Sequence, residues 1–434
     1  MSTVTIGLLG IAIFLILLLM GMPISVGMLV TGVVGYGVLT SFPAAVKLIT
    51  IDMFQSLASY NMSVIAMFTW MGYIAFHAGI GSKLYDFVYK FIGKWPGGLA
   101  LASEGACALF GAVCGSGAAT TATIGAIAFP EMKKRGYDPM LYTASVASGG
   151  GLGLLIPPSV TAIVYGVATQ QSIGKLFIAG ITAGILLMLL YMLVIFLQVR
   201  KNPDLAPRGE DFTWKERLQS LGGGLWETLL IFAFSIGGLS IGWFTPTEGG
   251  AIGAFLMLVL AFATRKLSWK SFIASMYDTC KTSGMVLFAI ACATLFGRFI
   301  AVAQIPAAIM RVVEENNLAP IVVLIIVIIV YLIGGCFIDS LPLIMITVPI
   351  FYPVIVECGY DPIWFGVICT VVCCIGMITP PVGINAYIAN KIAPDVPLQV
   401  VFKGCMPFLL AMLVGLIIMI IFPQMITFLP NLMK

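Results

Sequence analysis

Charged side chains are scarce in this chain of 434 residues. Asp, Glu, Lys and Arg make up 9% of it, whereas hydrophobic residues make up 60%. A soluble domain carries about 25% charged residues, so this composition excludes a soluble globular protein and indicates an integral membrane protein. Apolar runs of roughly 18 residues or more, long enough to cross a bilayer as helix, recur from end to end. The alternating ten-residue segments of outer-membrane barrels are missing, and the fold class predicted is an all-α polytopic membrane protein.

Residues of catalytic and metal chemistry are also rare. The chain has one histidine, His77, and no G-x-x-x-x-G-K-[ST] motif, so we expect no ATP hydrolysis. Its ten cysteines lie mostly inside apolar runs and are interpreted as buried thiols. No nucleophile with a matching base stands out, so neither enzymatic activity nor a cofactor is expected. The net charge of +4 is ordinary for an inner-membrane protein and does not indicate a nucleic-acid partner.

The apolar runs predict regular helices along the chain. The first 22 residues have no basic segment before their apolar run, so we predict a first transmembrane helix and not a cleaved signal. An amphipathic stretch at 47–59 and a basic loop with Lys83, Lys90 and Lys94 are also predicted. The polar stretch 200–220 is the expected connector between two halves. Regular spans are expected at 4–20, 23–40, 61–80, 173–199, 222–244, 247–264, 276–303 and 399–428.

Two stretches share one pattern of helix-breaking residues. Residues 130–158 begin with Pro, continue with Gly-Tyr-Asp-Pro and end with Pro-Pro, and residues 353–381 repeat these residues in register. The offset between the copies is constant, because 353 − 130, 359 − 136 and 380 − 157 all give 223. Gly and Pro do not continue a regular helix. The sequence therefore predicts two homologous units, each with a discontinuous helix, broken at 149–158 in the first and lying at 362–390 in the second.

A hairpin is predicted ahead of each discontinuous helix. Residues 98–130 are too long for one crossing and too short for two with a turn, which favours a re-entrant helical hairpin with a non-helical tip at Cys114–Thr121. Residues 319–353 repeat it, with G-G-C-F-I-D-S-L-P as the tip.

Flanking charges give the two hairpins opposite orientations. By the positive-inside rule the first enters from the cytoplasm, and the second, which lacks the basic excess, enters from outside. An odd number of crossings between the copies agrees, so the repeats are predicted to be inverted. The flanking residues are Lys90, Lys94, Lys133, Lys134 and Arg135 for the first hairpin, and Arg311, Glu314, Glu315 and Glu357 for the second.

Inverted repeats with discontinuous helices are typical of secondary transporters, whose ion and substrate sites lie where the breaks meet. Unwound carbonyls coordinate Na⁺, and half-helix N-termini face a carboxylate. Two oxygen-rich Na⁺ sites are predicted, although Gly and Ser/Thr clusters also serve close helix packing. The duplication in register favours the sites. The first comprises Ser116, Gly117, Thr120, Thr121, Gly150 and Gly151, and the second Asp339, Ser340, Gly376 and Thr379.

Each remaining polar candidate has a second interpretation. Asp339, a carboxylate at membrane depth, is either functional or the N-cap of the hairpin's second helix. Arg298 either contacts substrate or extends to the outer surface. Lys281 either pairs with Asp278, three residues before it, or faces an aqueous path, for which Arg298 and Glu104 are also candidates. A proton-relay role for His77 is not favoured. The substrate residues predicted are Pro157, Pro158, Pro380, Asn385 and Arg298.

Five motifs resemble the large membrane subunit of tripartite ATP-independent periplasmic (TRAP) transporters. They are G-S-G-A-A-T-T-A-T (115–123), F-P-E-M-K-K-R-G-Y-D-P (129–139), G-L-L-I-P-P-S (153–159), T-P-T-E-G-G-A-I-G-A (245–254) and I-T-P-P-V-G-I-N (378–385). The resemblance runs over nearly the whole chain. It implies Na⁺-driven uptake of an organic acid, such as a C4-dicarboxylate or sialic acid, across the bacterial cytoplasmic membrane.

The resemblance also implies partners and a mechanism. A periplasmic binding protein would deliver the substrate, and a small four-helix membrane subunit would be a separate chain, because this one begins directly at the large subunit. Family members resemble elevator-type carriers, in which hairpins and broken helices slide against a scaffold. The mobile part would be 98–170 and 319–393. The scaffold would be 1–97 and 171–318, with a cytoplasmic loop at 200–220, followed by a C-terminal helix at 394–434.

Two other kinds of function stay open at this stage. One is a stand-alone carrier, driven by Na⁺ or H⁺, that takes a carboxylate directly from solution. The other is a channel or a structural membrane scaffold. The duplicated broken helices argue against the channel and the scaffold, because neither needs them.

Overall fold

The computed structural model describes residues 2–433, apart from the side-chain environments of Gly223 and Gly224. Within this range the fold is all-helical and contains no β-strand, as predicted. Six helical segments are long and apolar enough to cross a membrane, or seven if Tyr60–His77 and Ile80–Ile92, bent by 71°, count as one. The six are Pro139–Thr169, Ile173–Lys201, Pro246–Ala263, Trp269–Val302, Ser340–Glu357 and Leu398–Ile421. The polytopic all-α class is therefore confirmed.

The N-terminal region contains more helix than expected. Residues 80–92, predicted as a basic loop, form helix α6, so that prediction was wrong. Ile80, Leu84 and Val88 recur at helical spacing and are buried, which gives this segment an apolar face despite its lysines. The elements are α1 (Thr3–Leu19), α2 (Ile24–Leu39), α3 (Phe42–Leu48), π-helix η1 (Ile49–Met53), α4 (Phe54–Ala58), 3₁₀-helix η2 (Tyr60–Met62), α5 (Ser63–His77) and α6 (Ile80–Ile92).

Both predicted hairpins are present as helix–turn–helix units. The first is α7 (Gly98–Cys114) and α8 (Gly117–Lys134), and the second is α19 (Pro320–Gly335) and α20 (Ser340–Glu357). The non-helical part of the first tip is only residues 115–116, so the prediction of Cys114–Thr121 was too long. Ser116 caps α8, and the hydroxyls of Thr120 and Thr121 donate to carbonyls one turn back, so this polar stretch stays helical.

Both helix breaks fall where they were predicted. The first discontinuous helix comprises α9 (Pro139–Gly150), α10 (Leu152–Leu155) and α11 (Val160–Thr169), and the second comprises α21 (Pro362–Gly376) and α22 (Ile384–Ile392). Asp138 and Asp361, one repeat offset apart, cap α9 and α21 with their side chains, and Pro follows each at the first helical position. α8 and α20 therefore begin 223 residues apart, and so do α9 and α21.

The rest of the chain differs from the prediction in three places. The predicted connector 200–220 contains a helix, and the span 222–244 includes π-helical turns. The predicted helix 399–428 is divided into α23, which ends at Ile421 just before Pro423, and α24. The elements are α12 (Ile173–Lys201), η3 (Pro203–Leu205), α13 (Trp214–Ser220), η4 (Leu221–Leu225), α14 (Trp226–Phe232), η5 (Ala233–Gly237), α15 (Gly238–Ser240), α16 (Pro246–Ala263), α17 (Trp269–Val302), α18 (Ile305–Glu315), α23 (Leu398–Ile421) and α24 (Gln424–Leu432).

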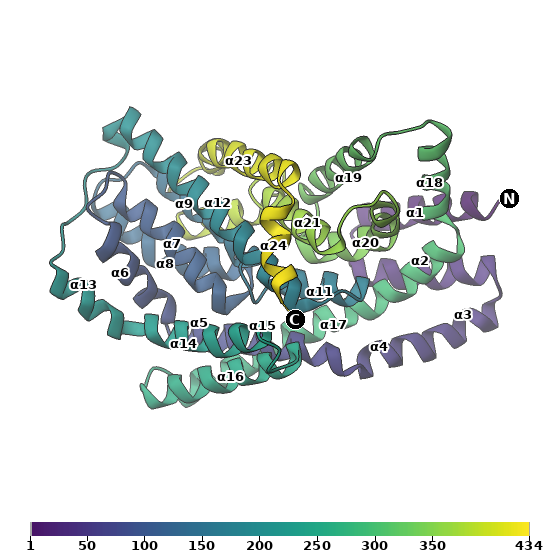
Figure 1. Cartoon of the computed structure of the whole chain (residues 1–434), viewed down its shortest axis with the longest axis horizontal. Helices are drawn as coiled ribbons and strands as arrows, with labels where there is room; N and C mark the ends of the chain where they lie inside the picture. Colours follow the sequence, from purple (N-terminus) through teal and green to yellow (C-terminus); the bar gives the residue numbers. More distant parts are fainter. Residues whose placement is uncertain (1, 434) are drawn as a thin grey trace.

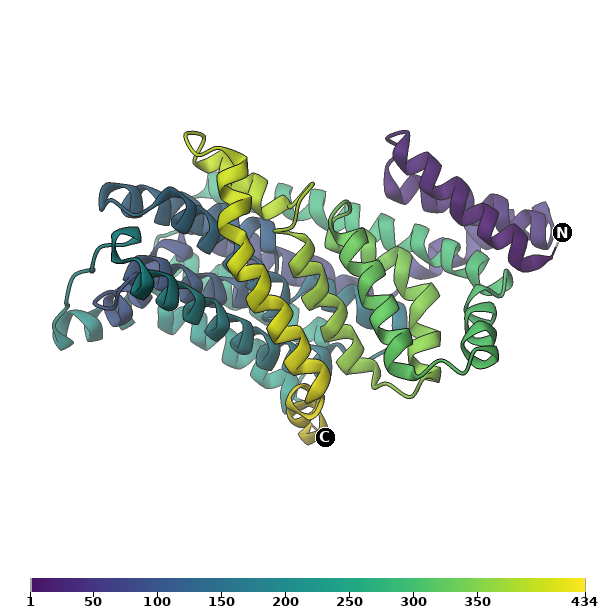
Figure 2. The same cartoon turned by 90° about the horizontal axis from the view of Figure 1, so that it is seen from above.

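The second half of each discontinuous helix packs against the hairpin of the other copy. α9 packs against α7 and α8 of its own hairpin, whereas α11 packs against α20 and α22 packs against α8. Figure 1 shows α7 and α8 toward one end of the long axis and α19 and α20 toward the other, with α11 and α21 between them. α23 crosses the middle of the molecule, in contact with α9, α21 and α22 (Figure 2).

A second group of helices packs along one side of this unit. α17 contacts α2 and α5, and α5 contacts α16. This group meets the hairpins and broken helices where α5 contacts α7 and α11 and where α17 contacts α20. The boundary between the two groups contains the cavity described next.

Candidate functional site

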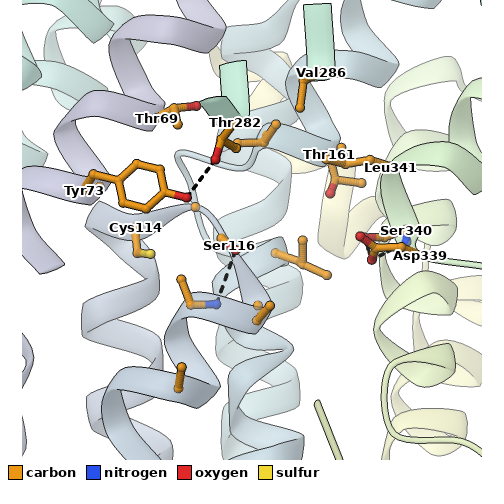
Figure 3. Close-up of a pocket in the computed structure, with 18 of the residues that line it drawn as sticks. Thr69, Tyr73, Cys114, Ser116, Thr161, Thr282, Val286, Asp339, Ser340 and Leu341 are labelled. Carbon is orange, nitrogen blue, oxygen red and sulfur yellow. Dashed lines mark hydrogen bonds between the residues drawn. The ribbon is translucent and has the colours of Figure 1, made fainter. Parts of the chain in front are cut away.

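A cavity of about 210 Å³ lies between the two hairpin tips and helices α5 and α17 (Figure 3). The first tip contributes Ser116 and the second Asp339, so both predicted tips reach the same space. Thr161 comes from α11, and Leu154 and Met377, one repeat offset apart, come from the two helix breaks. The cavity therefore joins both copies of the repeated sequence pattern to the neighbouring helix group.

Three helix N-termini converge on this cavity. The first turns of α8, α11 and α20 all contribute lining residues: Gly117–Ala119, Val160–Thr161 and Ser340–Leu341. No acidic side chain lies within any of these first turns. Free backbone N–H groups and the helix dipole make such ends favourable for an anion. These N-termini favour a carboxylate although no Lys or Arg is among the described lining residues, and the Asp339 carboxylate of the second tip is the one acidic group on that lining.

Ser116 and Asp339 hold equivalent positions at the two tips. Ser116 is the N-cap of α8, and its hydroxyl accepts a hydrogen bond from the Ala119 N–H at 3.4 Å. Asp339 is the N-cap of α20, and its Oδ1 accepts from the N–H and the hydroxyl of Ser340 at 2.7 and 3.1 Å. The N-cap interpretation of Asp339 is confirmed. Since the cap also faces the cavity, it does not exclude the functional interpretation.

Four hydroxyl groups that the sequence did not single out also line the cavity. Tyr73 of α5 and Thr282 of α17 are hydrogen-bonded at 2.8 Å (Figure 3). The hydroxyls of Thr69 on α5 and Thr161 on α11 are buried and have no hydrogen-bond partner among the described residues. A buried hydroxyl without a partner costs about 1–3 kcal/mol, so these two groups mark places for a polar ligand.

The first predicted Na⁺ site is brought together by a close approach of α8 and the first helix break. A Cβ on Gly150 would lie 1.8 Å from Thr121 Oγ1, and a Cβ on Gly153 would lie 2.3 Å from Thr120 Oγ1. Only glycine leaves room for the two threonine hydroxyls there. Gly153 was missed, although its repeat counterpart, Gly376, was predicted in the second site. Gly151 faces elsewhere, where its carbonyl accepts a hydrogen bond from the Cys374 thiol at 3.3 Å.

The second predicted site is built in the same way. A Cβ on Gly376 would lie 2.5 Å from the carbonyl oxygen of Gly335, a residue of α19 that sequence reasoning missed. The Val382 N–H donates to the Cys336 carbonyl at 3.2 Å, which ties the second tip to the loop after the prolines. Thr379, also in this break, donates its hydroxyl to the Ile375 carbonyl at 2.6 Å. The second break therefore adjoins the end of α19 and the start of the second tip, at Gly335 and Cys336.

The predicted substrate residues lie around the cavity and not on it. The described lining does not include Pro157, Pro158 or Pro380. Asn385 is fully buried between α22 and α9, and its Nδ2 donates to the Ala147 carbonyl at 3.1 Å. Arg298 is 61% exposed, and its Nε contacts Asp52 Oδ2 at 2.9 Å beside a separate cavity of about 650 Å³.

The structure also shows the surroundings of Asp278, His77 and Glu104. Asp278 pairs with His77 at 2.9 Å and not with Lys281. Glu104 is fully buried in α7, is absent from the cavity lining and has no hydrogen-bond partner among the described residues. An aqueous path is therefore not what surrounds Glu104 in this conformation.

A bundle of membrane-length helices with two helix breaks and a cavity at their junction defines a polytopic membrane permease. Residues 11–425 match the family described as tripartite ATP-independent periplasmic transporter, DctM component. The chain therefore belongs to this family, as the large membrane subunit of a TRAP transporter. TRAP permeases are inner-membrane proteins and not enzymes.

Relatives with different substrates in their names cover almost the whole chain. The C4-dicarboxylate TRAP transporter large permease protein DctM of Pseudomonas aeruginosa is 37% identical over 90% of both chains. The ectoine/5-hydroxyectoine permease UehC of Ruegeria pomeroyi is 32% identical over 96% of this chain and 97% of its own. The sialic acid permease SiaT of Haemophilus influenzae is 30% identical over 97% of this chain and 68% of its own.

A solved structure supports the fold alone. The Alcanivorax borkumensis YdaH transporter superimposes with a TM-score of 0.62 over 89% of each chain, at 14% sequence identity.

Proposed function

We propose that this chain carries out Na⁺-coupled uptake of an organic acid delivered by a periplasmic binding protein. The observation that carries this proposal is the convergence of three helix N-termini on one cavity between the two hairpin tips. Such an end attracts a carboxylate without a cationic side chain. C4-dicarboxylate and sialic acid in the names of relatives fit this electrostatic character. In this proposal a small four-helix membrane subunit is the partner within the bilayer.

The two Na⁺ sites of the proposal are the oxygen-rich junctions on either side of the cavity. Na⁺ is a hard cation that hydroxyl and carbonyl oxygens coordinate, and discontinuous helices supply such carbonyls in secondary transporters. The first site uses Ser116, Thr120 and Thr121 with the backbone at Gly150 and Gly153. The second uses Asp339 and Thr379 with the backbone at Gly335 and Gly376. Glycine at the positions of closest approach supports both assignments.

In this proposal, residues 98–170 and 319–393 move together as an elevator and are called the mobile unit. The two ranges are the copies of an inverted repeat. Two observations support this movement. α11 and α22 each pack against the hairpin of the other copy, so the two copies form one body. The cavity lies where that body meets α5 and α17, with Tyr73 and Thr282 on the facing side. Substrate bound there would be shielded by one group of helices and carried by the other.

Reconstitution tests this function directly. Proteoliposomes that contain the chain and its small subunit should accumulate substrate only with the binding protein present and an inward Na⁺ gradient. Uptake driven equally well by K⁺ would reject Na⁺ coupling, and full uptake without the binding protein would favour a stand-alone carrier. Conductance without saturable uptake would favour a channel.

Ser116→Ala and Asp339→Ala should each raise the Na⁺ concentration for half-maximal uptake. Each removes one proposed Na⁺ ligand and one N-cap, so the expected rise is roughly tenfold or more, which corresponds to about 1.4 kcal/mol. The control is Asp361→Ala, which removes the cap of α21 at 2.8 Å from the Trp364 N–H, outside both sites. An equal rise in the control would assign the effect to capping, and unchanged Na⁺ dependence in both variants would remove these residues from the sites.

Thr161→Val should raise the KM for substrate without changing the Na⁺ dependence. The Thr161 hydroxyl has no partner in the described structure, so its partner in the proposal is the substrate. Loss of one such hydrogen bond at about 1.4 kcal/mol gives a roughly tenfold higher KM. Thr169→Val is the matched control on the same helix, because the Thr169 hydroxyl already donates to the Tyr165 carbonyl at 2.7 Å. A KM equal to that of the unmodified protein would place the substrate elsewhere.

A further inference from the structure

A fully buried carboxyl group lies inside the mobile unit, apart from the cavity. Glu104 of α7 is 0% exposed, and neither of its carboxyl oxygens has a hydrogen-bond partner among the described residues. Its Oε2 faces Gly149 of α9, where a Cβ would lie 2.5 Å from that oxygen and 3.1 Å from Cys107 Sγ. The adjacent Gly150 faces Thr121 in the first Na⁺ site. Glu104 and the first Na⁺ site therefore contact adjacent residues of α9, Gly149 and Gly150.

The surroundings of Glu104 contain hydroxyls and thiols but no charge. Ser148 of α9 and Tyr191 of α12 are buried, and their hydroxyls also have no partner among the described residues. Tyr191 lies within electrostatic range of Glu104 and of the thiols of Cys374 on α21 and Cys405 on α23. No described Lys or Arg side chain donates a hydrogen bond to either carboxyl oxygen of Glu104. None of the described ion pairs compensates a negative charge at this position.

An isolated carboxylate at this depth is costly, so Glu104 must be neutralised by a bound cation. Two cations could supply the charge, Na⁺ or a proton. Na⁺ needs several oxygen ligands at once, whereas the Glu104 carboxyl faces Gly149 beside the Cys107 thiol, and sulfur is a poor ligand for a hard cation. A proton needs one oxygen only. The local chemistry therefore favours the proton.

We infer that Glu104 is a proton-binding site inside the mobile unit, and that its neutral, protonated form is the one that supports transport. The claim about which form supports transport rests on the proposed function, whereas the claim that Glu104 binds a proton does not. The proton sits on one carboxyl oxygen, and no bond is made or broken during transport. This site binds a proton and not Na⁺, and it lies against Gly149 of α9, whereas the first Na⁺ site uses Gly150.

Infrared spectroscopy of the reconstituted protein tests the proton directly, without transport. A protonated carboxyl has a C=O stretching band distinct from that of a carboxylate, and Glu104→Gln should remove one such band at neutral pH. The control is Glu357→Gln, which removes an exposed carboxyl at the end of α20 and should leave the protonated band unchanged. No loss of a protonated band in Glu104→Gln would overturn the proton site even if uptake is confirmed.

Uptake by the same variant tests the functional half. Gln is a neutral isostere of protonated Glu, so Glu104→Gln should retain uptake within about twofold, with the same number of Na⁺ ions per substrate. A loss of more than tenfold in a correctly folded variant would show that the carboxylate form is required and would overturn the inference. A reduced Na⁺ number would show that Na⁺ occupies the site and would overturn it as well. Absence of uptake in the unmodified protein would instead reject the proposed function and leave the infrared result standing.

Discussion

Gly150→Ala is expected to abolish Na⁺-dependent uptake. The new methyl group would lie 1.8 Å from Thr121 Oγ1 and 3.1 Å from Asn385 Nδ2. Thr121 cannot move aside without cost, because its β-branched side chain is restricted and its hydroxyl donates to the Gly117 carbonyl at 3.0 Å. Overpacking of this kind costs about 1–3 kcal/mol or more. The displaced oxygen is a proposed Na⁺ ligand, so the loss of uptake should be roughly a hundredfold or more, which corresponds to about 2.7 kcal/mol.

The matched control for this variant is Gly284→Ala. Gly284 lies in α17, and no atom lies within 4 Å of the position that its Cβ would occupy. Alanine is favoured over glycine inside a helix, so this control should fold and transport at least as well as the unmodified protein. Na⁺-dependent uptake should be measured in proteoliposomes after both variants show equal insertion. Uptake by Gly150→Ala within twofold of the control, with unchanged Na⁺ dependence, would refute the first Na⁺ site.

Glu227→Ala should cause the largest loss of stability among single substitutions at ion pairs of this protein. Both carboxylate oxygens of Glu227 accept from Lys266 Nζ at 2.7 Å, and the two side chains are only 4% and 14% exposed. Lys83 is a like-charged neighbour of Lys266. Removal of the carboxylate leaves a nearly buried, repelled ammonium group, and breaking a buried pair in this way costs about 3–5 kcal/mol.

Thermal unfolding of the detergent-solubilised protein measures this effect. Glu227→Ala combined with Lys266→Met should recover most of the loss, because no unpaired charge then remains. The control is Asp395→Ala, which breaks the exposed Lys133–Asp395 pair at 2.7 Å, where the side chains are 63% and 51% exposed. An exposed pair is worth about 0–1 kcal/mol, so this variant should unfold close to the unmodified protein. Equal destabilisation by the two single acidic substitutions would contradict the argument.

Local helix signals were readable because they act over a few neighbouring residues. The paired prolines predicted the helix breaks, since their effect depends on the backbone next to the residue itself. The N-caps at Asp138 and Asp361 were not predicted, although an aspartate directly before a proline is an equally local signal of a helix start. The same locality explains an error. The polar stretch after Ser116 was interpreted as non-helical, yet the side chains of Thr120 and Thr121 bond to carbonyls four residues back and keep it helical.

Site residues that depend on distant elements were less accessible. Gly335 and Gly153 were missed because their role is visible only when the opposing helix is in place. Tyr73 and Thr282 lie 209 residues apart, and nothing in either local sequence indicates that they share one hydrogen bond. Arg298 was an expected substrate contact by its charge, but its place beside Asp52 follows from the packing of the N-terminal helices.

The amino-acid sequence by itself determined that this protein is helical and membrane-embedded, and where its helices break. Those properties follow from composition and from interactions within about one helical turn, which need no knowledge of the rest of the chain. Only the tertiary structure decided that α11 and α22 cross to the hairpin of the other copy and that α5 and α17 complete the cavity. The reason is that helix contacts depend on which apolar faces meet, and many pairings satisfy the same local pattern of residues.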